Sequence, residues 1–113
     1  MRLPNARAAV VPREKITGYL LSLEHRTGRG KARFFAQFGF APESWEALAL
    51  ALRQHAAVHD VAGAEDTAFG TRYTIEGSLE SPDGRNPTVR AVWFIEEGEA
   101  LPRLVTAYPS SRR

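Results

Sequence analysis

The stretch that decides the fold is TVRAVWFIEEGEALPRLVTAYP, residues 88–109. Two runs rich in β-branched and aromatic residues flank the polar turn EGEALP, and this pattern predicts two antiparallel strands joined by a short connection. Residues 92–95 are all apolar, which is typical of a central strand buried on both faces. Arg90, Thr106 and Tyr108 interrupt the two runs, so each is either a packing compromise or part of a site.

The segments just before this stretch predict the rest of a sheet. TRYTIEGSLE (71–80) alternates with period two, with Tyr73 and Ile75 on one face. SPDGRNP (81–87) has Asp-Gly at its centre, a signal for a turn between antiparallel strands. Residues 61–70 form a connector rich in Gly and Ala that has room for one more short strand. We therefore expect a meander of three or four strands.

In the N-terminal half, apolar residues recur with helical spacing. REKITGYLLSL (13–23) places four of them on one stripe, namely Ile16, Tyr19, Leu20 and Leu23. KARFFAQF (31–38) and APESWEALALALRQHA (41–56) predict two more helices, the last starting near Pro42.

Helices followed by strands predict an α+β fold, with three N-terminal helices on one face of an antiparallel three- or four-stranded sheet. The chain has 113 residues, of which 43% are hydrophobic and 25% charged, so residues 1–113 are expected to form a single domain. Residues 1–11 are expected to form an extended arm that packs on the core, and residues 110–113 a frayed tail.

Several function classes are excluded or disfavoured. The absence of cysteine excludes disulfides, thiolate zinc sites and cysteine nucleophiles. His55 and His59 have the spacing of a metal pair, but no third ligand and no zincin Glu accompanies them, so no metal site is predicted. No cofactor motif is found, because GRGK lacks the P-loop spacing. No apolar run approaches the ~20 residues that span a bilayer, and no secretory signal is recognised, so we expect a cytoplasmic location without membrane partners.

Charge is distributed unevenly, although the formal net charge is only +2. Residues 1–34 hold eight Lys or Arg against two Glu, whereas residues 35–99 hold four Arg against eleven Asp or Glu. Around two glycines, the most basic stretch carries His25, Arg26, Arg29, Lys31 and Arg33. Backbone N–H groups at a helix start beside such cations predict an anion site. The alternative is an ordinary solvated surface.

The polar residues of the two last strands can extend this site. If their faces pair, Arg90 would offer a fork for phosphate, Thr106 a hydrogen bond, and Tyr108 a donor or a stacking surface. Alternatively, Thr and Tyr are simply good β residues and Arg90 lies along solvent. His25 would supply a group that titrates near neutrality. Such a set suits RNA cleavage, which needs a base, an acid and cations, and needs no metal.

The chain also resembles known proteins. GRGKARFF and PRLVTAYP, in an order of segments that spans almost the whole chain, are similar to an uncharacterised family of small bacterial single-domain proteins. More loosely, the helices before the sheet and the C-terminal RLVTAYP resemble the barnase, EndoU, colicin and RelE class of ribonuclease toxins. That resemblance implies a catalytic and phosphate-binding set, His25, Lys31, Arg90, Thr106 and Tyr108, with Arg29 and Arg33 as further substrate-binding cations.

Two functions follow as hypotheses. The first is a metal-independent endoribonuclease-like toxin domain of a bacterial toxin–antitoxin or competition system, with RNA as substrate and a small cognate antitoxin or immunity protein as partner. The second is a non-catalytic binding module, such as an antitoxin, immunity or adaptor protein, with a basic docking patch.

Overall fold

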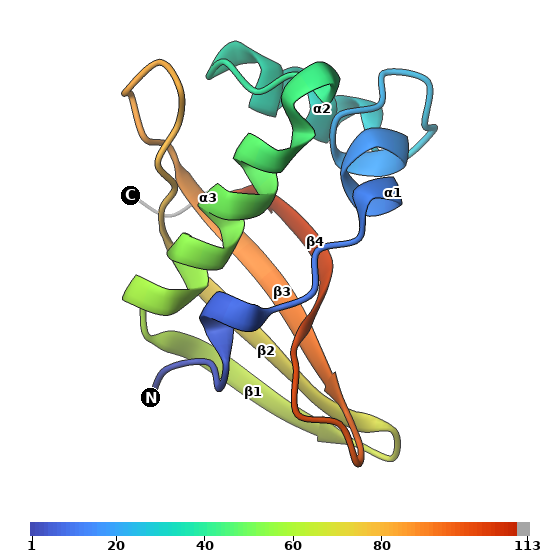
Figure 1. The fold of residues 1–113 in the computed structure, drawn as a ribbon, viewed down its shortest axis with the longest axis vertical. Coiled ribbons are helices and arrows are strands. Elements are labelled where there is room, and N and C mark those ends of the chain that lie inside the picture. Colours follow the sequence, from blue (N-terminus) through green and yellow to red (C-terminus); the bar gives the residue numbers. More distant parts are fainter. Residues whose placement is uncertain (111–113) are drawn as a thin grey trace.

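The computed structural model describes residues 1–110, and in it the helices precede the strands (Figure 1). The helical elements are η1 (Ala6–Ala8), α1 (Arg13–Lys15), the π-helical turn η2 (Ile16–Leu20), α2 (Arg29–Gln37), η3 (Pro42–Ser44) and α3 (Trp45–Val58). The strands are β1 (Val61–Thr67), β2 (Gly70–Ser78), β3 (Thr88–Glu96) and β4 (Arg103–Pro109). They pair in the order β1-β2-β3-β4, and every neighbouring pair is antiparallel. The predicted α+β class is confirmed, with four strands.

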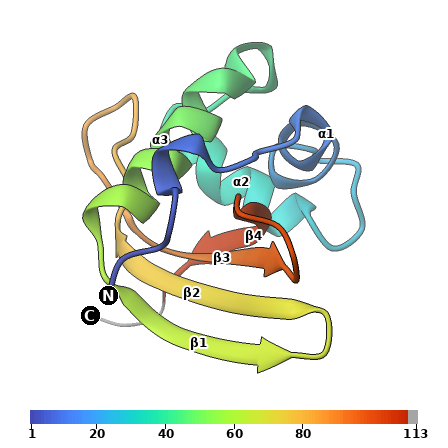
Figure 2. The same cartoon turned by 60° about the horizontal axis from the view of Figure 1, so that its bottom comes forward.

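The helices lie on one face of the sheet (Figure 2), and the core fills the space between them. The inner face of the sheet contributes fully buried side chains, among them Ile75, Val89, Ala91, Trp93 and Ala107. α3 contributes Leu48 and Leu52, and α2 contributes Phe35. Because side chains alternate along a strand, the chain neighbours of these residues, such as Arg90 between Val89 and Ala91, point to the opposite face of the sheet. No helix of residues 1–110 covers that face. No helix in the described part of the chain is long and apolar enough to cross a membrane.

The first predicted helix is shorter and wider than its sequence pattern indicates. After α1 the chain enters η2, where the Leu21 N–H donates to the Ile16 carbonyl at 2.7 Å, an i to i+5 bond. The wider turn brings Leu21 into the core, whereas Leu23, predicted to be on the apolar stripe, is 63% exposed. The helical extrapolation beyond Leu20 was therefore wrong.

The chain ends also depart from the simplest expectation. The N-terminal arm packs on the core as predicted, with Val11 buried, but it is not extended throughout because it contains η1. Val10 forms a parallel bridge with Arg103 and so covers one end of the outer edge of β4. Of the predicted frayed tail, Ser110 is described and its N–H donates to the Thr88 carbonyl at 3.0 Å; residues 111–113 lie outside the described residues.

Candidate functional site

A pair of hydroxyl groups marks the candidate site. The phenol oxygen of Tyr19 lies 3.3 Å from Oγ1 of Thr106, although the two residues are 87 positions apart in the sequence. Both line an open pocket of about 570 Å³ whose wall also includes Lys15, His25 and Val105. The pocket lies at the outer edge of β4, where the strand meets η2 and the loop before α2.

An irregularity in β4 places Thr106 there. The register of β3 with β4 shifts after Val92, so that Val92 pairs with Thr106 while the next residue, Trp93, pairs with Leu104. The strand thus carries one extra residue, Val105, and both Val105 and Thr106 line the pocket. Bulges of this kind redirect side chains and occur often beside active sites.

Tyr19 is held by close packing with the basic loop. Gly28 is buried, and a Cβ built on it would lie 2.5 Å from the Tyr19 carbonyl oxygen and 2.8 Å from its Cδ1 atom. Only glycine therefore allows the loop backbone to approach the tyrosine this closely. Gly28 thus packs directly against Tyr19.

Two lysines surround the Tyr19 ring. The Nζ atoms of Lys15 and Lys31 lie 5.5 and 5.2 Å from the ring centroid. Partial burial raises the pKa of the Tyr19 phenol, but hydrogen bonds with Thr106 and Lys31 and the positive charges of both lysines outweigh it. The net result is a pKa below the ordinary value for tyrosine. A phenol with a lowered pKa in a cationic pocket is a candidate proton-transfer group.

His25 packs edge-on against Tyr19, with ring centroids 4.8 Å apart. Its Nδ1 accepts hydrogen bonds from the backbone N–H groups of Thr27 at 3.1 Å and Gly28 at 3.0 Å. Its own carbonyl accepts the N–H of Arg29 at 3.0 Å. His25 thus accepts the N–H groups of Thr27, Gly28 and Arg29, just before and at the start of α2. The anion site expected at this helix start stays a prediction.

These contacts also determine which ring nitrogen of neutral His25 carries the proton. With Nδ1 accepting two N–H groups, the neutral ring carries its proton on Nε2. His25 can therefore donate a hydrogen bond into the pocket through Nε2, whereas a role as general base at that atom conflicts with the geometry.

A second polar group lies on the uncovered face of the sheet. Glu76, Arg90 and Tyr108 are direct cross-strand neighbours on β2, β3 and β4. Arg90 Nη2 lies 3.4 Å from Oε1 of Glu76, whose side chain is only 11% exposed. A hydrogen bond with Tyr108, together with the hydrogen bond and charge of Glu76, raises the pKa of Arg90. The predicted pairing of Arg90 with Tyr108 is therefore present in the structure.

The predicted residues thus fall into two neighbouring groups. His25, Lys31 and Thr106 gather around Tyr19, whereas Arg90 and Tyr108 gather beside Glu76. The groups meet along β4, where Thr106 and Tyr108 are two residues apart, about 6.6 Å in a regular strand.

Two predicted residues lie outside both groups, and three residues within the groups were not predicted. Arg29 and Arg33 lie exposed on α2. Tyr19, Lys15 and Glu76 were missed as site residues. Tyr19 lies on an apolar stripe whose spacing is that of a core residue, and no local motif reveals that its hydroxyl group reaches β4.

The histidine pair on α3 is structural. His55 is 1% exposed, and its Nε2 lies 2.9 Å from the Val89 carbonyl and 3.2 Å from the Gly77 carbonyl. His59 directs its Nε2 to the Ser78 carbonyl at 2.9 Å. Because both Nε2 atoms face carbonyl oxygens, both rings serve as donors that attach α3 to the sheet.

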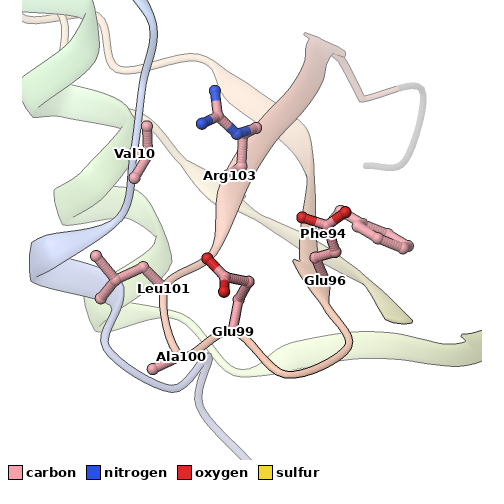
Figure 3. Close-up of a pocket in the computed structure, with 7 residues that line it drawn as sticks. All are labelled: Val10, Phe94, Glu96, Glu99, Ala100, Leu101 and Arg103. Carbon is pink, nitrogen blue, oxygen red and sulfur yellow. The ribbon is translucent and has the colours of Figure 1, made fainter. Parts of the chain in front are cut away.

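A further cavity of about 320 Å³ lies at the β3–β4 connection (Figure 3). The side chains of Glu96, Glu99 and Arg103 surround it, with Leu101 and Val10 on the other side. Its wall contains none of the predicted site residues. Its carboxylates contrast with the cations around Tyr19.

Fold and site together define a small α+β domain with a cationic tyrosine–threonine pocket at the edge of an antiparallel sheet. The chain belongs to the family described as Domain of unknown function (DUF6883), whose model matches residues 2–111. This agrees with the expected membership in one family over almost the whole chain. No curated protein matches it in sequence.

Among solved structures, the fold is similar to that of a chain in the contact-dependent growth inhibition toxin–immunity protein complex from Klebsiella pneumoniae 342. The TM-score is 0.71, the sequence identity is 17%, and the match covers 95% of this chain and 98% of that chain. At this identity the likeness concerns the fold.

Proposed function

We propose that this chain is a metal-independent endoribonuclease-like toxin domain of a bacterial toxin–antitoxin or competition system. The observation that carries the proposal is the Tyr19 phenol, whose pKa is lowered beside Lys15 and Lys31 and which lies next to the hydroxyl of Thr106 on a bulged strand. Perturbed pKa values cluster at functional sites. The fold-level neighbour, which comes from a toxin–immunity complex, adds support from analogy.

The proposed reaction is an internal transfer within RNA. The ribose 2′-oxygen bonds to the adjacent phosphorus, the bond from phosphorus to the 5′-oxygen breaks, and a 2′,3′-cyclic phosphate and a 5′-hydroxyl result. Tyr19, as the phenolate, accepts the 2′-hydroxyl proton, and Tyr108, as the phenol, donates one to the leaving 5′-oxygen. Lys31 and Arg90 stabilise charge on the phosphorane, and Nε2 of His25 donates to a phosphate oxygen. Arg29 and Arg33 attract flanking phosphates.

The experiment is RNA degradation by the purified chain in the presence of a chelator. Wild type should release fragments that end in 2′,3′-cyclic phosphate, and its expression should arrest bacterial growth. Tyr19→Phe should abolish both, while Tyr73→Phe, the same change on the inner face of β2, should preserve both. Intact RNA together with normal growth at high expression would overturn the proposal.

A second function has one specific observation in its favour. The neighbouring structure contains an immunity protein as well as a toxin, so the fold match is equally compatible with a binding role. Under that role the cationic pocket docks a partner protein and no turnover occurs. A stable complex with a cognate protein, combined with the absence of RNA cleavage, would select this alternative.

A further inference from the structure

A second surface of the molecule is the outer edge of β1. β1 is the terminal strand of the sheet, and residues 62–67 are all exposed. Among residues 1–110, the one backbone hydrogen bond to β1 from outside β2 runs from the Val61 N–H to the Met1 carbonyl at 2.7 Å. An edge strand of this length presents outward N–H and C=O groups that can pair with another strand.

The surroundings of this edge are acidic. Glu65 and Asp66 lie on β1 itself. The hollow between the two hairpin ends, about 440 Å³, is lined by four carboxylates, Asp66, Glu96, Glu97 and Glu99. A cation close to β1 is Arg72, 3.9 Å from Glu65 and exposed. At the tip of the same hairpin, Phe69 is 76% exposed and offers an apolar anchor.

These charges decide which strand can pair there. If two copies of the chain paired antiparallel through β1 in the register centred on Glu65 and Asp66, each of these carboxylates would face a carboxylate of the other copy, and like charges directly opposite are destabilising. A strand that carries Lys or Arg at these positions would instead gain opposite-charge pairs across the edge. The carboxylates thus oppose self-pairing and favour a basic partner.

We propose that the outer edge of β1 binds a basic β-strand of a partner protein by strand addition, with Lys or Arg side chains of that strand against Glu65 and Asp66. This surface shares no residue with the Tyr19 pocket. The proposal therefore goes beyond the proposed function and does not depend on RNA cleavage.

The test uses as the probe a blocked synthetic peptide that repeats Lys-Lys-Thr, since Glu65 and Asp66 are consecutive on β1 and point to opposite faces of the sheet. Wild type should bind it, and amide hydrogen exchange should slow in residues 62–67. The combined change Glu65→Lys and Asp66→Lys should weaken binding about tenfold or more. Glu43→Lys with Glu46→Lys, an equal change of charge on exposed residues at the start of α3, should leave affinity nearly unchanged.

Three results would overturn the proposal. The first is absence of binding to wild type. The second is binding without slowed exchange in β1, and the third is equal binding of a peptide with proline at alternate positions, which cannot pair as a strand. A complementary measurement is sedimentation of Glu65→Thr with Asp66→Thr, which should self-associate where wild type does not. If that variant stays as monomeric as wild type, Glu65 and Asp66 do not prevent self-pairing through β1.

Discussion

The hydroxyl groups of Tyr19 and Thr106 lie 3.3 Å apart, where a π-helical turn meets a bulged edge strand. Two irregular elements thus meet at one point, each different from the regular helix or strand that its sequence predicts. Such departures from regular geometry are common at functional sites. The contact also couples the phenol to a strand that carries the second polar group, around Arg90.

The acidity of Tyr19 should depend on its neighbours. The hydrogen bond with Thr106, the hydrogen bond with Lys31 and the charge of Lys31 all lower the pKa of Tyr19. Thr106→Val removes the first of these, and Lys31→Gln removes the other two. Each change should therefore raise the pKa of Tyr19, since partial burial, which also raises it, remains. Titration of the tyrosine ring carbons by NMR measures this directly. Thr74→Val, the same substitution on β2, should leave the Tyr19 titration unchanged, and equal titration curves in all variants would contradict the assigned contacts.

The two glycines of the basic loop should respond oppositely to alanine. At Gly28 a Cβ would approach Tyr19 to 2.5 Å, so Gly28→Ala should cost about 1–3 kcal/mol of unfolding free energy and displace the loop. A Cβ built on Gly30 would meet no atom within 4 Å apart from its chain neighbours and the backbone of its own helix, and the residue is helical. Gly30→Ala should stabilise the protein by about 0.5–1 kcal/mol. Urea unfolding tests both, and a harmless Gly28→Ala would show that the loop does not pack on Tyr19 as described.

Two substitutions of His25 should separate its structural and chemical roles. Asn places an acceptor oxygen near the position of Nδ1 and can keep the bonds from Thr27 and Gly28, whereas Gln extends too far to do so from the same backbone. His25→Asn should retain the wild-type stability and His25→Gln should lose about 1 kcal/mol.

The rate of RNA cleavage by His25→Asn then reports on the Nε2 donor, because Asn has no group at that position. If the stable Asn variant cleaves RNA as fast as wild type, donation from Nε2 plays no part, and His25 serves only to order the start of α2. If it loses cleavage while its thermal unfolding is unchanged, the donor role stands.

The sequence predicted the regular parts of the fold because they follow from hydrophobic period. Alternation along 71–80 depends on adjacent residues, so Tyr73 and Ile75 were assigned to one face, and both pack in or against the core. The cross-strand contact of Arg90 with Tyr108 followed from the same alternation once the two strands were paired.

The site around Tyr19 could not be predicted in the same way. It requires a widened helical turn and an extra residue in β4, and neither leaves a signal in hydrophobic spacing. His25 was selected for its chemistry in a basic loop, but the local hydrogen bonds that occupy Nδ1 depend on the loop conformation. Side-chain partners distant in the sequence, such as Thr106 for Tyr19, are a property of the tertiary structure alone.

Buried His55 should make stability depend on pH in a defined window. Burial lowers its pKa from 6.5 to about 4, opposed by the hydrogen bonds to the Val89 and Gly77 carbonyls and assisted by the charge of His59. Because the folded-state pKa is the lower one, the unfolded chain takes up the proton first as the pH falls. Stability contributed by neutral His55 is therefore complete above pH 6.5 and is lost between pH 6.5 and 4.

The loss should amount to about 3 kcal/mol from this residue, since each pKa unit corresponds to about 1.4 kcal/mol. Urea unfolding of wild type at a series of pH values across the window measures it, with His55→Gln as the comparison. Gln keeps an N–H donor for the two carbonyls but does not titrate, so its unfolding free energy should fall less steeply over the same range. Parallel curves for the two proteins would mean that His55 becomes protonated in the folded state as readily as in the unfolded chain, and that its ring is not the buried donor that attaches α3 to β2 and β3.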